Sequence, residues 1–180
     1  MSLQRKQVLT STRMSYGVRR YHSWPVLTQQ TIGEHVAQVL RIYRETFGCV
    51  ESEVVDYILY HDSGELKLGD LPFPVKSQNP VLKVECDRVE YEALQDMNVA
   101  LPRITEIQKL RVKYADVMEM LEFGAFELRL GNQSAAPIVA DTKTALHGLM
   151  ARMVRSDFDA ALCYWNKMRT SGVFDSGEEC

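Results

Sequence analysis

The stretch that decides the fold is Tyr60–Lys76, with the sequence YHDSGELKLGDLPFPVK. After Tyr60 come His61 and Asp62, which offer an imidazole nitrogen and a carboxylate to one divalent metal ion. Glu65 follows one turn later, and a Gly-Asp-Leu-Pro corner then leads to Lys76. A His-Asp pair alone is common by chance, whereas this succession of groups is much rarer. A metal site built on this stretch needs further ligands from the segments that flank it.

Upstream, Thr31 and Glu34 form a capping-box pattern that predicts the start of a helix. Apolar residues then recur at helical spacing, and Gly48 is a natural stop. His35 lies in the first turn of this predicted helix, near its apolar side. A single histidine in such a place is more often a hydrogen-bonded core residue than a metal ligand, so other residues must decide between the two.

Residues 53–61 are predicted to form the next helix, with His61 and Asp62 at its C-terminal end. Residues 64–80 carry three prolines and two glycines and are predicted to be a loop or a broken helix. Residues 81–97 are again predicted to be helical. The candidate buried positions of that helix are Val84, Val89, Tyr91 and Leu94.

Downstream, Pro102 is predicted to open a long helix that ends near Gly131–Asn132. Asp116 lies inside this helix beside apolar neighbours. Because a buried aspartate is costly unless it is neutralised, Asp116 is expected to bind a metal ion or to pair with Lys113, one turn earlier. A last helix is predicted to start at Pro137 and to include Trp165.

The composition agrees with a compact helical protein. The 180 residues are 46% hydrophobic and 25% charged, which is enough apolar material for a real core. No strand pattern stands out. We predict a single all-α domain of about six helices over residues 1–180, with its core in residues 18–170 and a polar tail in residues 172–180.

Charge and cysteine content exclude several classes of function. The net charge is −3 and the pI is about 5.8, so a nucleic-acid polymer is not expected as the main partner. No apolar run reaches transmembrane length and the N-terminus lacks a signal-peptide core. The four cysteines form no C-x-x-C pair and read as thiols of a reducing compartment. The expected location is the cytoplasm, which is the host cytoplasm if a phage encodes the protein.

Four residues on three predicted helices make a candidate metal site: His35, His61, Asp62 and Asp116. Two imidazoles and two carboxylates suit a first-row divalent ion and leave positions for water or substrate. That arrangement is what metal-assisted hydrolysis requires, because the ion lowers the pKa of a bound water and neutralises charge on a phosphoryl oxygen.

With these pieces in order, the sequence resembles the HD-domain phosphohydrolases, in particular the bacterial 5′-deoxynucleotidases and the compact phage dATP triphosphohydrolases. The resemblance covers roughly Val18 to Asn132. It is carried by Arg19-Arg20-Tyr21-His22, Gln30-Thr31-Ile32-Gly33-Glu34-His35, His61-Asp62-Ser63-Gly64-Glu65, the Gly69–Lys76 segment, Lys113-Tyr114-Ala115-Asp116 and Leu130-Gly131-Asn132. The full set is specific, whereas any single piece would be weak.

The resemblance implies a role for each matching position at the reaction centre. His35, His61, Asp62 and Asp116 would hold the metal ion. Glu65 would handle the proton, either by activating the attacking water or by protonating the leaving oxygen.

The resemblance also implies the substrate contacts. Arg20 matches the family arginine that contacts the 5′-phosphate, and a guanidinium suits that task because it donates paired hydrogen bonds. Lys76 and Lys113 are candidates for further phosphates, although each could also be an ordinary lysine or an ion-pair partner. Asp70 matches an aspartate that reads the sugar hydroxyl, and it could equally stabilise the turn after Gly69.

Tyr21 departs from the family pattern, since the bacterial nucleotidases have a tryptophan that packs on the sugar at that place. This weakens any inference of strict deoxyribose preference. Trp24 is close enough in sequence to form part of a wall for the base.

The expected function is therefore a metal-dependent deoxynucleotide phosphohydrolase that cleaves at the 5′-phosphate ester. The short spacing between Asp62 and Asp116 resembles that of the phage triphosphohydrolases more than that of the bacterial nucleotidases, and more than one cation suits a triphosphate. The resemblance therefore favours a dNTP triphosphohydrolase with dATP-like substrates. The alternatives are a 5′-deoxynucleotidase that acts on dNMPs and, in another class, a non-catalytic nucleotide-sensing module. The metal is Zn²⁺, Co²⁺, Mn²⁺ or Mg²⁺, because this ligand set accepts several ions. The resemblance also implies a homo-oligomer.

Overall fold

The structure is a computed structural model that describes residues 11–71, 75–76 and 79–172. The chain divides into two compact units, each made of separate stretches of sequence. The first unit comprises Met1–Pro25, Gln29–Ala37 and Asp56–Pro102, and the second comprises Val26–Thr28, Gln38–Val55 and Arg103–Cys180. One domain over residues 1–180 stays a prediction. Of the predicted polar tail, only Gly172 lies within the described residues.

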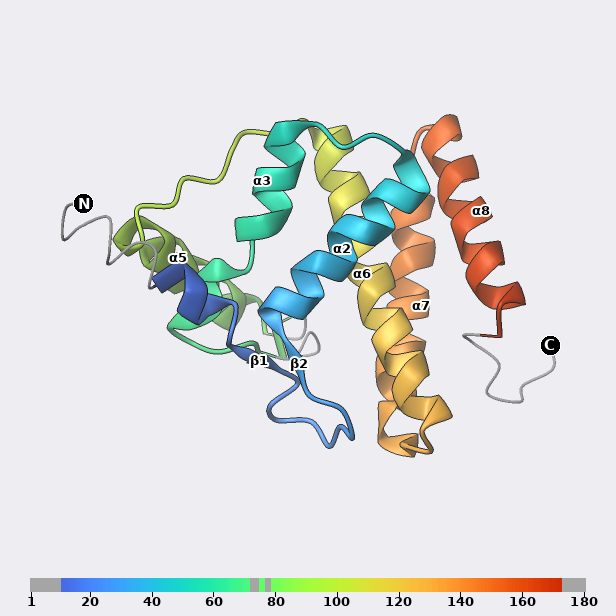
Figure 1. Ribbon diagram of the computed structural model, residues 1–180, viewed down its shortest axis with the longest axis horizontal. Coiled ribbons are helices and arrows are strands. Elements are labelled where there is room, and N and C mark those ends of the chain that lie inside the picture. Colours follow the sequence, from blue (N-terminus) through green and yellow to red (C-terminus); the bar gives the residue numbers. More distant parts are fainter. Residues whose placement is uncertain (1–10, 72–74, 77–78, 173–180) are drawn as a thin grey trace. The chain divides into compact units, whose positions relative to one another are not determined.

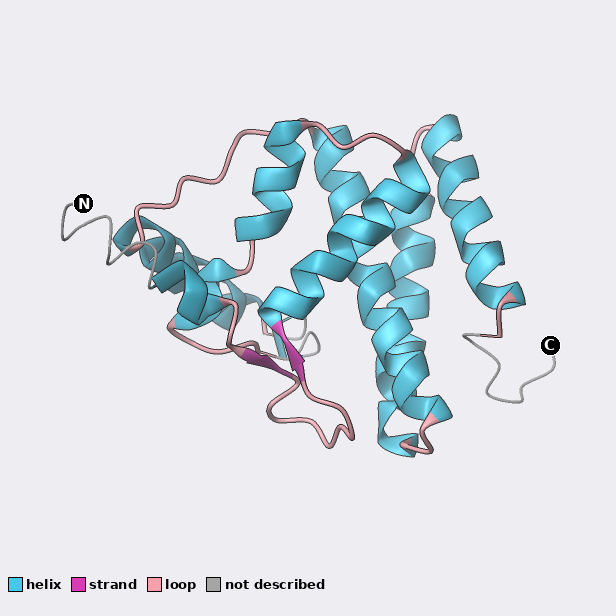
Figure 2. Cartoon of the chain, in the orientation of Figure 1, coloured by secondary structure: helices cyan, strands magenta, loops and turns pink. Residues whose placement is uncertain are grey.

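Helices dominate the described residues, which confirms the predicted all-α class (Figures 1 and 2). The long helices are α2 (Ile32–Phe47), α3 (Ser52–Tyr60), α5 (Pro80–Asp96), α6 (Glu106–Arg129), α7 (Ala136–Met150) and α8 (Arg155–Thr170). Two short 3₁₀ helices are η1 (Ser63–Leu66) and η2 (Gln133–Ala135). None of these helices has the length and apolarity that crossing a membrane requires.

A small hairpin in the first unit leads into α2. Strand β1 (Arg19–Arg20) pairs antiparallel with β2 (Gln30–Thr31), so that Arg20 lies opposite Gln30. Our prediction contained no strand and was wrong at this hairpin, because two-residue strands are too short to show an alternating pattern. The predicted capping box is present: the Glu34 carboxylate accepts from the Thr31 amide at 2.7 Å, and the Glu34 amide donates to Thr31 Oγ1 at 3.2 Å.

The first unit also holds η1 and α5 in close contact. A Cβ placed on Gly64 of η1 would lie 2.5 Å from the backbone oxygen of Glu90 on α5, so only glycine fits there. Ala93, Leu94 and Met97 form a buried cluster at the end of α5. Two predicted core positions of α5 were wrong. Val84 and Tyr91 are 64% and 62% exposed, because only one narrow side of this helix is covered.

Helices α6 and α7 lie side by side in the second unit (Figure 1). A Cβ on Gly124 of α6 would approach Val139 to 3.0 Å and Ile138 to 3.2 Å, so this glycine allows the close packing of the two helices. The predicted start of α6 at Pro102 was wrong. Thr105 caps the helix instead, with Gln108 completing a capping box.

The predicted single helix after Pro137 was also wrong, since α7 ends at Met150 and α8 begins at Arg155. Val154 has extended backbone angles (φ −65°, ψ 156°), which break the helical path without any glycine or proline in residues 151–154. The first turn of α8 is fixed by Asp157, whose carboxylate accepts two hydrogen bonds of 2.8 Å from Arg111 on α6.

Glu127 is fully buried in the second unit and has many donors. Its carboxylate accepts from the Leu27 amide at 2.7 Å, the Thr28 amide at 2.8 Å, the Thr28 hydroxyl and Asn132 Nδ2 at 2.7 Å. Burial alone would raise the pKa of Glu127, but these hydrogen bonds outweigh it and lower the pKa below its usual value.

Candidate metal centre and active site

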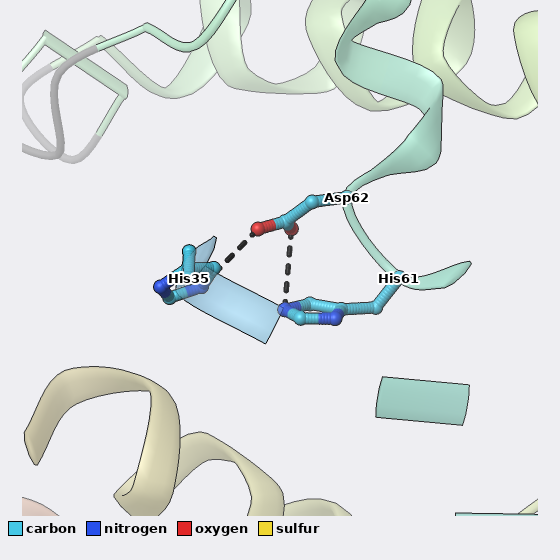
Figure 3. A group of neighbouring side chains, drawn as sticks. All are labelled: His35, His61 and Asp62. Carbon is cyan, nitrogen blue, oxygen red and sulfur yellow. Dashed lines mark ion pairs between the residues drawn. The ribbon is translucent and has the colours of Figure 1, made fainter. Parts of the chain in front are cut away.

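Three of the predicted ligands, His35, His61 and Asp62, come together in the first unit (Figure 3). His35 projects from the first turn of α2, and the other two lie in the turn between α3 and η1. His35 Nε2 lies 3.4 Å from Asp62 Oδ2, and His61 Nε2 lies 3.3 Å from Asp62 Oδ1. The two imidazole rings are 5.9 Å apart between centroids.

The hydrogen bond of His61 prepares its ring for a metal. Nδ1 lies 2.7 Å from the carbonyl oxygen of Ile58, so it carries the proton and donates to that oxygen. In the neutral ring, Nε2 is then left with a lone pair on the side that faces Asp62. A lone pair that faces a carboxylate is unfavourable unless a cation lies between them.

The spacing of the donor atoms agrees with that requirement. One ligand atom from each of the three residues lies within 4.8 Å of the others. Two ligands of a tetrahedral ion, each about 2.1 Å from it, are separated by roughly 3.4 Å. Each His-to-Asp62 distance is close to this edge length, the two ending on different oxygens of Asp62, and the three residues together can hold a divalent ion.

Asp116, the fourth predicted ligand, belongs to the second unit, where it is buried on α6. Its carboxylate accepts a hydrogen bond of 2.6 Å from Lys113 Nζ, which is the pairing that the sequence left open. Lys113 is half exposed. The role of Asp116 as a metal ligand stays a prediction.

Glu65 lies in η1, one turn after Asp62, and is 5% exposed. Burial, followed by the charges of Asp62 and Asp70, raises the pKa of Glu65 to about 9, although Lys76 and Arg20 act against this shift. Among the described residues, its Oε2 has no hydrogen-bond partner. Such a carboxyl group holds its proton at neutral pH and has an oxygen available for a new contact.

Three of the residues predicted to contact phosphate and sugar, Arg20, Tyr21 and Asp70, form one buried group at the hairpin. Asp70 accepts the Tyr21 amide at 3.0 Å and lies 3.8 Å from Arg20 Nε. Tyr21 has a positive φ of 54°, a strained conformation for a tyrosine, and the Asp70 contact stabilises it. Asp70 therefore stabilises the Tyr21 turn of the hairpin, whereas the alternative from the sequence concerned the turn after Gly69 and stays a prediction.

The two remaining predicted contacts, Trp24 and Lys76, also lie in the first unit. Trp24 is half-buried, and its amide donates to the Tyr21 carbonyl at 2.9 Å. Lys76 Nζ lies 2.9 Å from Glu90 Oε1 and 3.5 Å from Glu65 Oε1. Pro72, Phe73 and Pro74 of the preceding motif lie outside the described residues.

Sequence reasoning missed Glu90. In the sequence it is one of several acids on α5. Glu90 lies near Lys76 in the folded structure because η1 packs on α5. The sequence feature that indicates this packing is Gly64, where a larger side chain would not fit.

The fold defines the class of protein. The chain is similar to the HD phosphohydrolase DatZ of cyanophage S-2L, solved with dA and one catalytic Zn²⁺ bound. The TM-score is 0.73 at 16% identity, and the match covers 90% of this chain and 96% of that one. This likeness confirms the predicted HD-domain helical fold.

Sequence comparison then gives the family. Residues 12–162 match the family model described as 5′-deoxynucleotidase YfbR-like, so the chain belongs to that family. This confirms the resemblance seen in the sequence.

Individual curated relatives match over shorter stretches. A 5′-deoxynucleotidase of Vibrio vulnificus is 32% identical over 91 residues, which is 44% of this chain and 47% of that protein. A 5′-deoxynucleotidase of Yersinia pestis is 29% identical over 121 residues, or 53% of this chain and 61% of the relative. The chain thus spans about half to three fifths of the length of these relatives.

Proposed function

We propose that this protein is a metal-dependent phosphohydrolase of deoxynucleotides that cleaves the ester at the 5′-oxygen. The observation that carries the proposal is the His35–His61–Asp62 cluster with buried Glu65 one turn away. The YfbR-like family and its 5′-deoxynucleotidase relatives support it.

The residues of the site divide the work. His35, His61 and Asp62 hold the ion, with Asp116 as the proposed fourth ligand. When bound, the ion supplies Lewis-acid chemistry, because it lowers the pKa of water and draws charge from a phosphoryl oxygen. Glu65 carries the proton, and its Oε2 is the atom that exchanges it with the attacking water or the leaving 5′-oxygen.

For the substrate we propose a deoxynucleoside monophosphate. A triphosphate needs several available cations, but Lys76 is already paired with Glu65 and Glu90. Arg20 remains the proposed contact to a single 5′-phosphate. The name of the family points the same way. The dNTP triphosphohydrolase that the sequence favoured is the second candidate.

We propose that Asp70, Tyr21 and Trp24 shape the sugar and base end of the site. Asp70 accepts the Tyr21 amide and holds that backbone in its positive-φ conformation. In this proposal the hairpin turn faces the substrate. An aromatic face beside the base binds by stacking and tolerates more than one base.

The test is a screen of all dNMPs, dNTPs and NTPs with Zn²⁺, Co²⁺, Mn²⁺ and Mg²⁺, with products separated by chromatography. Release of deoxynucleoside and orthophosphate from dNMPs supports the monophosphate proposal. Release of intact triphosphate from dNTPs supports the second candidate instead. If no nucleotide is hydrolysed with any ion while nucleotides still bind, the non-catalytic sensing module is the better description.

Two expectations from the sequence concern the setting of the enzyme rather than its chemistry. We propose that the protein is cytoplasmic and, as the resemblance implies, a homo-oligomer. Light scattering on the purified protein measures its molar mass directly, and a mass of 20.6 kDa would contradict the oligomer.

A further inference from the structure

Glu90 lies on α5 where this helix touches the turn that carries Glu65. The contact is at backbone level, since a Cβ on Gly64 would lie 2.5 Å from the Glu90 oxygen and 2.8 Å from its Cα. The Glu90 side chain therefore leaves α5 directly beside η1, and its carboxylate is only 21% exposed.

Lys76 joins Glu90 to Glu65. Its Nζ lies 2.9 Å from Glu90 Oε1 and 3.5 Å from Glu65 Oε1, so the closer partner is Glu90. The Lys76 side chain is 21% exposed and that of Glu65 is 7% exposed, so solvent screens this chain of charges less than it screens a surface pair.

The charges agree with this arrangement. Burial alone would lower the pKa of Lys76, but the hydrogen bond to Glu90, the charge of Glu90 and, whenever it is ionised, the charge of Glu65 raise it above its usual value. The ammonium is therefore held as a cation between two carboxyl groups.

The difference between the two Lys76 distances matters because the lysine side chain is flexible, so the position of its ammonium group depends on the carboxylates that bind it. Without a charge at position 90, the ammonium either closes on Glu65 or turns to solvent. In the first case it occupies the oxygens that Glu65 needs for proton transfer, and in the second it stops orienting Glu65.

We propose that Glu90 is a positioning residue of the active site, whose carboxylate holds Lys76 so that Lys76 orients Glu65 through Oε1 and leaves Oε2 available. This inference rests on the proposed function and deepens it, because it makes Lys76 an orienting group for Glu65 rather than a phosphate ligand. It also adds to the site a residue from α5.

The test is a double-mutant cycle with Glu90→Gln and Lys76→Met, measured as kcat and KM on the best nucleotide of the screen. We expect Glu90→Gln to lower kcat about tenfold, the effect of losing one charge-assisted hydrogen bond, with KM changed less than about twofold. Adding Glu90→Gln to Lys76→Met should cause no further loss, because Glu90 acts through Lys76. Glu90→Asp, which keeps the charge, should recover part of kcat.

Glu92→Gln is the matched control, because Glu92 is an exposed acid of the same helix that pairs with Arg88 at 2.5 Å. It should leave kcat unchanged. Circular dichroism and melting curves confirm that each variant is folded before its kinetics are compared.

A second readout does not depend on turnover. Acetylation of Lys76 by acetic anhydride, followed by mass spectrometry, should be several-fold faster in Glu90→Gln than in the wild type or Glu92→Gln, because the released ammonium loses its proton more easily. Equal labelling of Lys76 in all three proteins would overturn the proposed contact.

The outcomes separate the two proposals. Wild-type kcat in a folded Glu90→Gln variant, or losses that add in the double variant, would overturn the role of Glu90 and leave the proposed function standing. A wild-type protein that hydrolyses no nucleotide would overturn the proposed function, and with it any catalytic role of Glu90.

Discussion

Glu65 in the first unit and Glu127 in the second are both buried glutamates, yet their surroundings are opposite. Glu127 has four hydrogen-bond donors, and its pKa is lowered. Glu65 has a long contact to Lys76, two aspartates nearby and a pKa raised to about 9.

The difference shows how burial alone fails to identify a reactive carboxylate. A glutamate that supports the fold is stabilised when every oxygen lone pair is used. A glutamate that exchanges protons with a substrate must keep an oxygen for that partner, so the folded protein carries it at a cost in stability. Glu127 is of the first kind, and we infer that Glu65 is of the second.

The largest expected effect is on turnover by Glu65→Gln. Loss of the proton-transferring group should lower kcat by about 10³-fold while nucleotide binding persists. Steady-state kinetics and calorimetric titration with the nucleotide measure the two quantities. Glu127→Gln, once shown to be folded, should keep kcat within about threefold. Equal losses in both variants would break the contrast between the two glutamates.

The next effect is on the packing that confines Glu65. Gly64→Ala forces a Cβ against the Glu90 backbone, and overpacking of this kind costs about 3 kcal/mol. The melting temperature should fall by roughly 6 to 12 °C. Gly148→Ala is the control, because that helical glycine has nothing within 4 Å of an added Cβ and should be neutral or stabilising. An unchanged melting temperature in Gly64→Ala would mean that η1 and α5 are not in contact.

Glu127→Gln should destabilise the protein by about 2 kcal/mol. The reason is that the NH₂ group of glutamine cannot accept the hydrogen bonds that the second carboxylate oxygen of Glu127 accepts. The expected fall in melting temperature is roughly 4 to 8 °C. Urea unfolding, with the midpoint and slope both recorded, measures the free energy directly. A variant as stable as the wild type would show that the Leu27, Thr28 and Asn132 contacts contribute little.

The smallest expected effect is the pH dependence of stability in the presence of a chelator. The pKa of Glu65 in the folded protein is raised to about 9 from 4.5. The contribution of protonated Glu65 to the free energy of unfolding is therefore fully present below pH 4.5 and is lost as the pH rises through 9. Glu65→Gln should therefore melt above the wild type at pH 9, and close to it at pH 4.5. Glu127 has the opposite sign, since its lowered pKa adds stability that is lost as pH falls below 4.5. Parallel pH profiles for wild type and Glu65→Gln would contradict the raised pKa.

The parts of the molecule that were predictable from sequence are local ones. The capping box at Thr31, the stop at Gly48 and the adjacency of His61 and Asp62 depend on residues a few positions apart. The helix break before Arg155 was not predictable, because residues 151–154 contain neither glycine nor proline and the anchor of α8 is Arg111, distant in sequence.

The same distinction holds within the candidate site. His35 was predicted as a ligand only in combination with the other candidate ligands, because a single histidine in that place is more often a core residue. The structure places it against Asp62. Glu90 and Glu127 resemble ordinary acids in the sequence. Glu90 contacts Lys76, and Glu127 contacts Leu27 and Thr28, which lie about a hundred residues away in the sequence. No local sequence pattern therefore predicts either environment.

The charge balance around Glu65 has a consequence for the order of binding. The carboxyl groups of Asp62, Glu65, Asp70 and Glu90 outnumber the two cations, Arg20 and Lys76, even when Glu65 keeps its proton. A region of net negative charge attracts a divalent cation and repels a nucleotide anion. Binding should therefore be ordered: the metal ion binds first and makes the net charge of the site positive, and the nucleotide binds second. Each nucleotide should then bind more weakly as a chelator removes the ion.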